Sequence, residues 1–176
     1  MNYKILTINN KIEEKFLRKK TADFDFSKFT KKELKDLLKI MRKIMRESIG
    51  IGLSANQIGL NLRFFVAQIS TTPIKRDENN KIILPPDSSM KFYAIFNPEI
   101  VKFSDDKIII EEGCLSVPGY YGEVERPEKI VLEYYNRYGK KIKIKADGLL
   151  ARVFQHEVDH LNGVLFIDKI KKARAK

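Results

Sequence analysis

Cysteine, histidine and tryptophan are scarce in this chain of 176 residues, which has one cysteine, two histidines and no tryptophan. A single cysteine cannot form an internal disulfide, so a disulfide-stapled secreted domain is excluded, and a free thiol suits a reducing compartment. No apolar run approaches the roughly 18 residues of a membrane-spanning helix, and the N-terminus lacks the apolar core of a secretion signal. We therefore expect a cytoplasmic protein that does not enter a membrane.

Length and composition fit one folded domain. The chain is 43% hydrophobic, which is enough for a single core, and it has neither an internal repeat nor a linker. We predict one domain over residues 1–176. The sequence carries no signal for assembly, and a monomer is expected.

Positive charge is in excess, with a formal net charge of +11. Such an excess suits a polyanionic partner such as RNA. The run from Lys169 to Lys176 is the densest basic segment. A solvated lysine-rich surface would produce the same pattern, so both interpretations stand.

One amphipathic helix is predicted near the N-terminus. Thr30 and Glu33 form a capping-box pattern, and apolar residues then recur every three or four positions until Ile49. Methionines at this spacing indicate core packing rather than a binding face.

Strand-like patterns account for much of the rest. The segment 62–101 is strand-like, as in the apolar run 64–67, except for a polar stretch over 71–91 that is interpreted as an exposed hairpin or loop. Segments 130–135 and 142–145 flank a turn and predict a hairpin with one wet face. The apolar run 164–167 is expected to rejoin a sheet.

The two histidines lie four positions apart, in a His-Glu-x-x-His pattern of His156, Glu157 and His160. One turn of helix separates them, so both rings can hold one metal ion with Glu157 beside them. Asp147 is a candidate cap for this helix and Gly163 a candidate stop. We predict an α+β fold in which small antiparallel or mixed sheets pack around this central helix, plus the N-terminal amphipathic helix.

A catalytic metal usually has three protein ligands, so a third must come from elsewhere. Residues 161–176 contain no glutamate, and Phe166 stands where a longer zinc motif has its third histidine. Asp168 remains an alternative downstream. Upstream, Cys114 follows a glycine, and a thiolate with two imidazoles makes a sensible three-ligand site with one open position.

Three separated motifs are residues 50–57 (Gly-Ile-Gly-Leu-Ser-Ala-Asn-Gln), 112–116 (Glu-Gly-Cys-Leu-Ser) and 155–161 (Gln-His-Glu-Val-Asp-His-Leu). In this order they resemble the motifs of the peptide deformylase family. The resemblance spans nearly the whole chain. Ser54 departs from the alanine that is common in the family, a small-for-small change expected to matter little.

The resemblance implies a role for each motif. It makes Cys114, His156 and His160 the metal ligands and Glu157 the general base. It assigns oxyanion stabilisation to Gln57 and the backbone N–H of Leu115. It also implies that Ile51, Gly52 and Gly113 hold the substrate backbone, and that Ile51 and Val153 line the pocket for the first side chain.

The implied reaction is removal of the N-terminal formyl group from formyl-methionyl nascent polypeptides, with release of formate. A divalent cation would lower the pKa of a water from 15.7 toward ~7, and Glu157 would take the proton. The resemblance favours Fe²⁺, with Zn²⁺, Ni²⁺ or Co²⁺ as substitutes, and it suggests association with the ribosome through the basic surface.

Two other functions compete with this one: a metallopeptidase that cuts peptide bonds, and a basic RNA-binding protein with a structural metal.

Near the metal, Arg126 is an expected ion-pair partner of Glu112. Asp159 is expected either to support the site or to face solvent, and Tyr120 and Tyr121 either border the cleft or pack elsewhere.

Overall fold

The computed structural model describes residues 3–70, 75–79, 82–83 and 89–175, and it has the predicted α+β class. The helices of these ranges are α1 (Lys11–Leu17), α2 (Lys31–Glu47) and α3 (Gly148–Leu161), with 3-10 turns η1 (Phe26–Lys28), η2 (Ala55–Ile58) and η4 (Phe166–Asp168). The strands are β1 (Gly52–Ser54), β2 (Phe64–Ser70), β3 (Lys75–Arg76), β4 (Ile82–Ile83), β5 (Met90–Phe103), β6 (Lys107–Cys114), β7 (Val117–Pro127), β8 (Lys129–Tyr135), β9 (Lys141–Asp147) and β10 (Ile170–Ala175).

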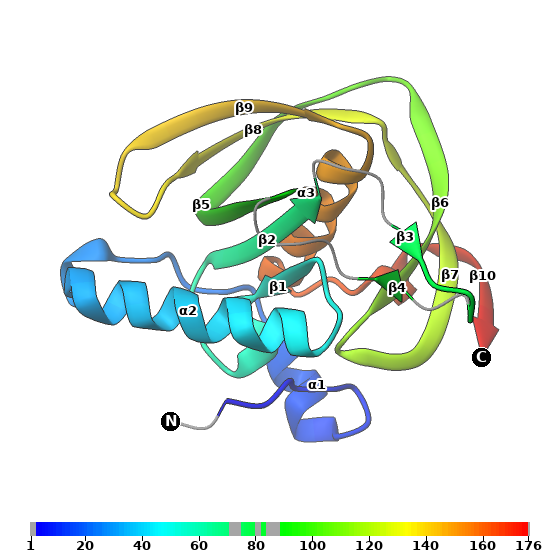
Figure 1. Cartoon of the computed structure of the whole chain (residues 1–176), viewed down its shortest axis with the longest axis horizontal. Helices are drawn as coiled ribbons and strands as arrows, with labels where there is room; N and C mark the ends of the chain where they lie inside the picture. Colours follow the sequence, from blue (N-terminus) through cyan, green and yellow to red (C-terminus); the bar gives the residue numbers. More distant parts are fainter. Residues whose placement is uncertain (1–2, 71–74, 80–81, 84–88, 176) are drawn as a thin grey trace.

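The strands form two main antiparallel sheets. One has five strands in the order β1-β2-β5-β8-β9, and the other has three in the order β10-β7-β6. Strand β5 is long and pairs with β2 through its first half and with β8 through its second half. Helix α3 lies in the middle of the molecule, with the three-stranded sheet to one side (Figure 1). In this position, α3 can contact side chains from both sheets.

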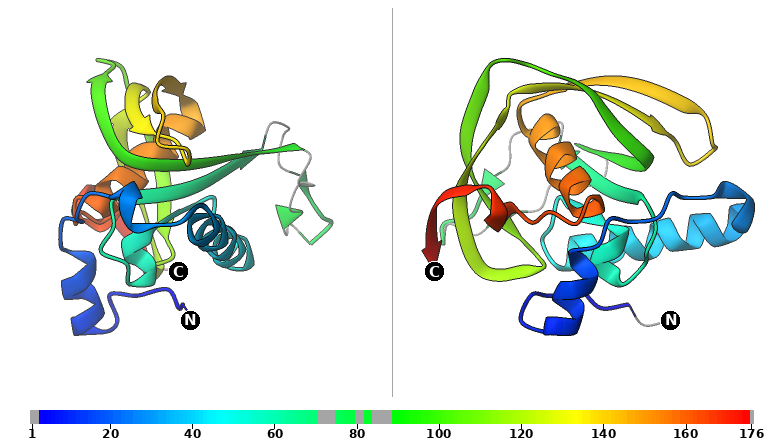
Figure 2. Two further views of the ribbon diagram at one scale, coloured as in Figure 1. Left: turned by 90° about the vertical axis from the view of Figure 1, so that its left-hand side faces the viewer. Right: turned by 180° about the vertical axis from the view of Figure 1, so that it is seen from behind.

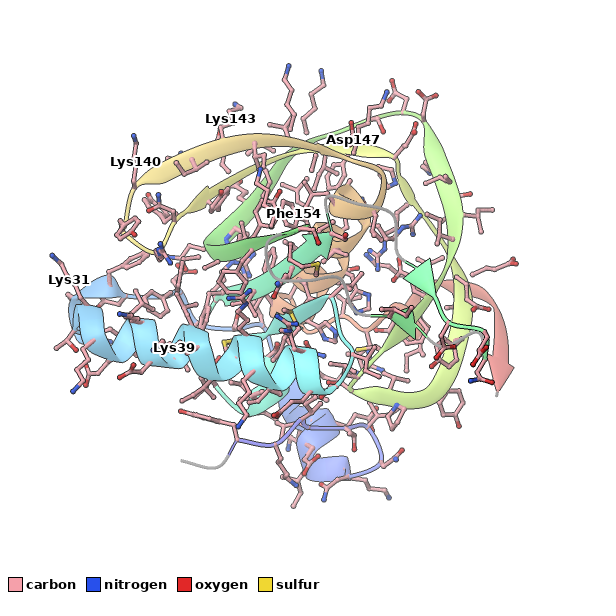
Figure 3. The ribbon with its side chains drawn as sticks, in the orientation of Figure 1. Lys31, Lys39, Lys140, Lys143, Asp147 and Phe154 are labelled. Carbon is pink, nitrogen blue, oxygen red and sulfur yellow. The ribbon has the colours of Figure 1, made fainter. Side chains whose placement is uncertain are left out.

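The two faces of β2 bury separate cores, because side chains alternate across a strand. Phe65 and Ala67 pack with Phe154 and other apolar residues of α3, whereas Phe64 and Val66 pack under α2. Figure 3 shows Phe154 in the interior beside the sheet. The five-stranded sheet is therefore covered by α3 on one face and by α2 on the other.

Helix α2 confirms the prediction made from its sequence. Thr30 caps it, and Thr30 and Glu33 exchange both hydrogen bonds of a capping box. Met41 and Met45 are fully buried in the core under this helix, as expected for methionines that fill a core.

The hairpin of β8 and β9 also follows the prediction. Its wet face carries exposed lysines at alternate positions of β9, and Lys143 bonds Glu133 across the hairpin. Lys140 and Lys143 reach away from the body of the molecule (Figure 3). The segment 71–91 contains the hairpin β3–β4, which lies apart from the main sheets in Figure 2, while residues 71–74, 80–81 and 84–88 lie outside the described residues.

Two local predictions are corrected. Residues 164–167 do not form a strand, because Leu165 and Phe166 are buried in a small core of their own and the chain turns through η4 before β10 begins at Ile170. Asp147 stands at the N-cap of α3, but its side chain makes no capping hydrogen bond.

Gly163 follows the end of α3 with a φ of 75°, as expected for a helix stop. Across the described ranges we find no helix whose length and apolar character would suit a bilayer crossing.

Candidate metal centre

The two histidines leave α3 one turn apart and meet Cys114 at the end of β6. Their ring centroids are 4.9 Å apart, and Cys114 Sγ lies 3.1 Å from Nε2 of His160. One ligand atom from each of the three residues lies within 4.8 Å of the others. The alternative ligand, Asp168, lies elsewhere and pairs with Arg18 and the N–H of Leu165. Cys114 is thus the candidate third donor, and Asp168 is not near the two rings.

The three donors fit one divalent cation. In a tetrahedral site with usual bond lengths, a sulfur and a nitrogen ligand lie about 3.5 Å apart, which the present spacing approaches. Burial alone would raise the pKa of the Cys114 thiol, but the two imidazoles lower that pKa well below its usual range. The thiolate is the form that binds metal. His160 is 1% exposed, so little water competes for its ring.

A buried carboxylate supports one of the ligands. Glu112 Oε2 lies 3.0 Å from Nδ1 of His156 and accepts from Arg126 Nη2 at 2.9 Å. Its other oxygen, Oε1, accepts from Arg126 Nε at 2.6 Å and from Arg152 Nη1 at 2.8 Å. Both oxygens of Glu112 are therefore saturated, which fixes the carboxylate beside His156.

The expected ion pair of Arg126 and Glu112 is confirmed. Of the two alternatives for Asp159, the structure has the one in which it supports the site, through Arg126. Arg126 Nη1 donates to Asp159 Oδ2 at 2.6 Å, and Lys169 Nζ donates to the same carboxylate. Burial alone would raise the pKa of Glu112, but the hydrogen bonds from Arg126 and His156 hold that pKa well below its usual range. Glu112 is therefore an anion beside the metal ligand.

Arg152 was missed by the sequence analysis. It is 5% exposed and donates to the carbonyl oxygens of Val124 and Ile108 as well as to Glu112. It thus ties α3 to both β6 and β7. Its position one turn before His156 on the same helix face is the signal that could have found it.

Glu157 lies against β1. Its Oε2 accepts from the hydroxyl of Ser54 at 2.5 Å, and a Cβ on Gly52 would come within 2.3 Å of its Oε1. The side chain is buried, and this burial raises the pKa of Glu157, against the opposing effect of the two histidines. A carboxylate with a raised pKa is suited to accept and return a proton.

Gln57 lies beside the sulfur of Cys114. Its Nε2 donates to Ser116 Oγ at 3.1 Å and lies 3.6 Å from Cys114 Sγ, while its Oε1 accepts from the N–H of Ser54 at 2.9 Å. The amide is therefore oriented with its donors toward the centre.

The other predicted residues surround this group. Ile51 is 39% exposed, whereas Val153 is buried in the core that α3 shares with the five-stranded sheet. A Cβ on Gly113 would come within 2.7 Å of the ring of Tyr121, which packs over it. Leu115 lies close to Gly50, so the first and second motifs meet.

The chain was compared with known proteins. The model of the polypeptide deformylase family matches residues 3–176. A peptide deformylase of Roseiflexus castenholzii is 40% identical over 168 residues, which cover 95% of this chain and 88% of that protein.

Two solved structures have the same fold. A probable peptide deformylase from the Synechococcus phage S-SSM7 has a TM-score of 0.76 and 38% identity, with 96% of this chain and 100% of that chain covered. A peptide deformylase from Acinetobacter baumannii, solved with Met-Ala-Ser bound, has a TM-score of 0.79 and 29% identity, with 97% and 99% covered. The chain belongs to the polypeptide deformylase family and, as a metal-dependent hydrolase, has the peptide deformylase activity of that family.

Proposed function

We propose that residues 1–176 act as one catalytic domain that removes the formyl group from N-formylmethionyl peptides and releases formate. The observation that carries this proposal is the meeting of Cys114, His156 and His160, with Gln57 beside the sulfur and Glu157 next to His156 on α3. A hydrolysis needs an electrophile-activating centre, a base and an anion-stabilising donor, and these groups supply all three.

Cys114, His156 and His160 would hold the metal ion, for which we propose Fe²⁺, with Zn²⁺, Ni²⁺ or Co²⁺ as substitutes. Thiolate and imidazole donors suit all of these ions. When bound, such an ion acts as a Lewis acid that makes water a competent nucleophile near neutral pH.

Glu157 is the general base in this proposal. It accepts the proton of the attacking water and then returns it to the departing amine. Its burial supports this role, because burial raises the pKa of Glu157 and a carboxylate with a raised pKa is a stronger base toward the proton of water.

In this proposal, Gln57 and the backbone N–H of Leu115 stabilise the negative charge that develops on the formyl oxygen by donating hydrogen bonds to it. The fixed direction of the Gln57 amide supports this role, since a donor held in place needs no reorganisation when charge appears.

The substrate backbone is held by Ile51, Gly52 and Gly113 in this proposal, with Ile51 and Val153 bordering the pocket for the first side chain. Strands β1 and β6 lie at the edges of their sheets. Extended peptides commonly bind along a strand edge in this way. The Met-Ala-Ser complex of the Acinetobacter relative supports a peptide of this kind as ligand.

We further propose a cytoplasmic monomer that associates with the ribosome through its basic surface. The net charge of +11 and the exposed lysines of α2 and β9 support attraction to RNA. Binding of this kind weakens as salt rises, so pelleting with ribosomes across a salt titration tests it.

The activity is tested by incubating the metal-loaded protein with formyl-Met-Ala-Ser and, separately, with Met-Ala-Ser. We expect formate and a free amine from the first peptide and no cleavage of the second. Cleavage of the unformylated peptide would identify a metallopeptidase, and metal binding without hydrolysis would identify a structural site.

A further inference from the structure

Ser54 is the residue at which this chain departs from the alanine common in the family, and its hydroxyl touches the proposed base. Ser54 is fully buried, and its Oγ lies 2.5 Å from Oε2 of Glu157 and 3.2 Å from the backbone oxygen of the same residue. From the sequence alone, this serine was expected to matter little. Alanine could make neither contact.

The hydroxyl has one proton, and its short distance to Oε2 makes the carboxylate its main acceptor. Glu157 Oε1 lies over Gly52, where there is no room for a Cβ. The two ends of the carboxylate are thus fixed by neighbouring parts of β1, one by a hydrogen bond and one by close packing. A carboxylate with one oxygen engaged by a donor has the other oxygen free to take a proton.

Ser54 also contacts the second proposed catalytic side chain. Its backbone N–H donates to Gln57 Oε1 at 2.9 Å, which turns the Gln57 amide nitrogen toward Cys114 and Ser116. Ser54 itself is held in β1, where it pairs with Phe65 of β2. One residue of an anchored strand therefore contacts both groups that flank the metal ligands.

We propose that Ser54 is a positioning residue for the reaction: its hydroxyl holds the Glu157 carboxylate in one orientation, so that Oε1 receives the proton of water. This inference rests on the proposed role of Glu157 as general base. Loss of the hydroxyl removes the hydrogen bond that fixes Oε2, so the packing on Gly52 alone would orient the carboxylate. Fewer of the bound substrates then meet a correctly placed base, and turnover falls while substrate binding is retained.

The test compares Ser54→Ala with wild type on formyl-Met-Ala-Ser, both alone and combined with Glu157→Gln. We expect Ser54→Ala to lower kcat about tenfold, to change KM less than about twofold and to keep the metal content of wild type. In the Glu157→Gln background the same substitution should change kcat less than about twofold, because the group that it positions is already disabled. Ser54→Thr keeps the hydroxyl and should restore most of kcat.

Thr21→Val is the matched control. Thr21 is also buried, and its hydroxyl also donates to a backbone oxygen of α3, that of Leu161, at 3.0 Å. It has no contact with Glu157, so its loss should lower the unfolding temperature without lowering kcat.

Two results would overturn the proposal for Ser54: an unchanged kcat in Ser54→Ala, or an equal fall of kcat in both backgrounds. Normal turnover of the Glu157→Gln single variant would instead overturn the proposed role of Glu157. The two failures are therefore distinguishable.

Discussion

The carboxylate of Glu112 lies 3.0 Å from Nδ1 of His156, whereas Nδ1 of His160 has no partner in the part of the chain that the structure describes. A carboxylate on Nδ1 fixes the tautomer and direction of an imidazole and raises its basicity as a ligand. The two histidines of the centre are thus held differently. His156 is oriented by a polar network, and His160 is oriented by packing and by its place on α3.

Arg152 is expected to control how firmly the protein holds its metal, because it binds Glu112 and joins α3 to β6 and β7. Arg152→Met should speed metal loss to a chelator by about 10–100-fold, the range typical of lost outer-shell partners. The measurement is the rate of metal transfer to an excess of chelator.

Arg63→Met is the control for this prediction. Arg63 also anchors α3, through the oxygens of Leu161 and Asn162, but it does not contact Glu112. The substitution Arg63→Met should lower the unfolding temperature and leave the rate of metal loss unchanged. Equal rates of metal loss from both variants would mean that Arg152 only stabilises α3 and has no specific effect on the metal.

Removal of the thiolate should empty the centre. Cys114→Ala leaves two imidazoles, and two ligands bind a divalent ion far more weakly than three. We expect the variant to purify with little metal by elemental analysis. Full occupancy would mean that another group is the third ligand.

Glu157→Gln should separate metal binding from turnover. The amide is close in shape to the carboxylate but cannot accept the proton, so kcat should fall by at least about 10²-fold. Metal content should stay that of wild type, since Glu157 is not one of the three donors. Near-normal kcat with formyl-Met-Ala-Ser would exclude it as the base.

Gln57→Ala should lower kcat more than it raises KM, because its proposed hydrogen bond forms chiefly in the transition state. One such donor is worth about 3 kcal/mol, or roughly a hundredfold in rate. Steady-state kinetics give both constants. A change confined to KM would assign Gln57 to ground-state binding instead.

Local patterns in the sequence predicted much of the fold. The capping box at Thr30 and Glu33 and the turn between β8 and β9 are encoded by neighbouring residues, so both were found. The run 164–167 was misread because its burial comes from contacts with distant residues such as Val117 and Val124. An apolar run of this length fits a buried turn as well as a strand.

The candidate metal ligands could be predicted because the chain has only one cysteine and two histidines. The residues around them could not, since their importance depends on three-dimensional contacts. Arg152 looks like a polar interruption of an apolar helix until its contacts with Glu112, Val124 and Ile108 are seen. The contact of Ser54 with Glu157 likewise depends on the approach of α3 to β1, which the sequence does not show.

Gly52 provides the most direct steric test of how β1 holds the base. A Cβ at this position would lie 2.3 Å from Oε1 and 2.8 Å from Cδ of Glu157, which is closer than atoms can approach. Gly52→Ala should therefore displace the carboxylate and lower kcat by about 10²-fold, the effect of a displacement of about 1 Å.

Gly139→Ala supplies the contrast for Gly52→Ala. Gly139 has a φ of 74° in the turn between β8 and β9, where an added Cβ meets nothing within 4 Å. The substitution strains the backbone and should lower the unfolding temperature while kcat is kept. If Gly52→Ala behaves like Gly139→Ala, losing stability but not turnover, then Glu157 can move without cost and its close packing on β1 is not needed for the reaction.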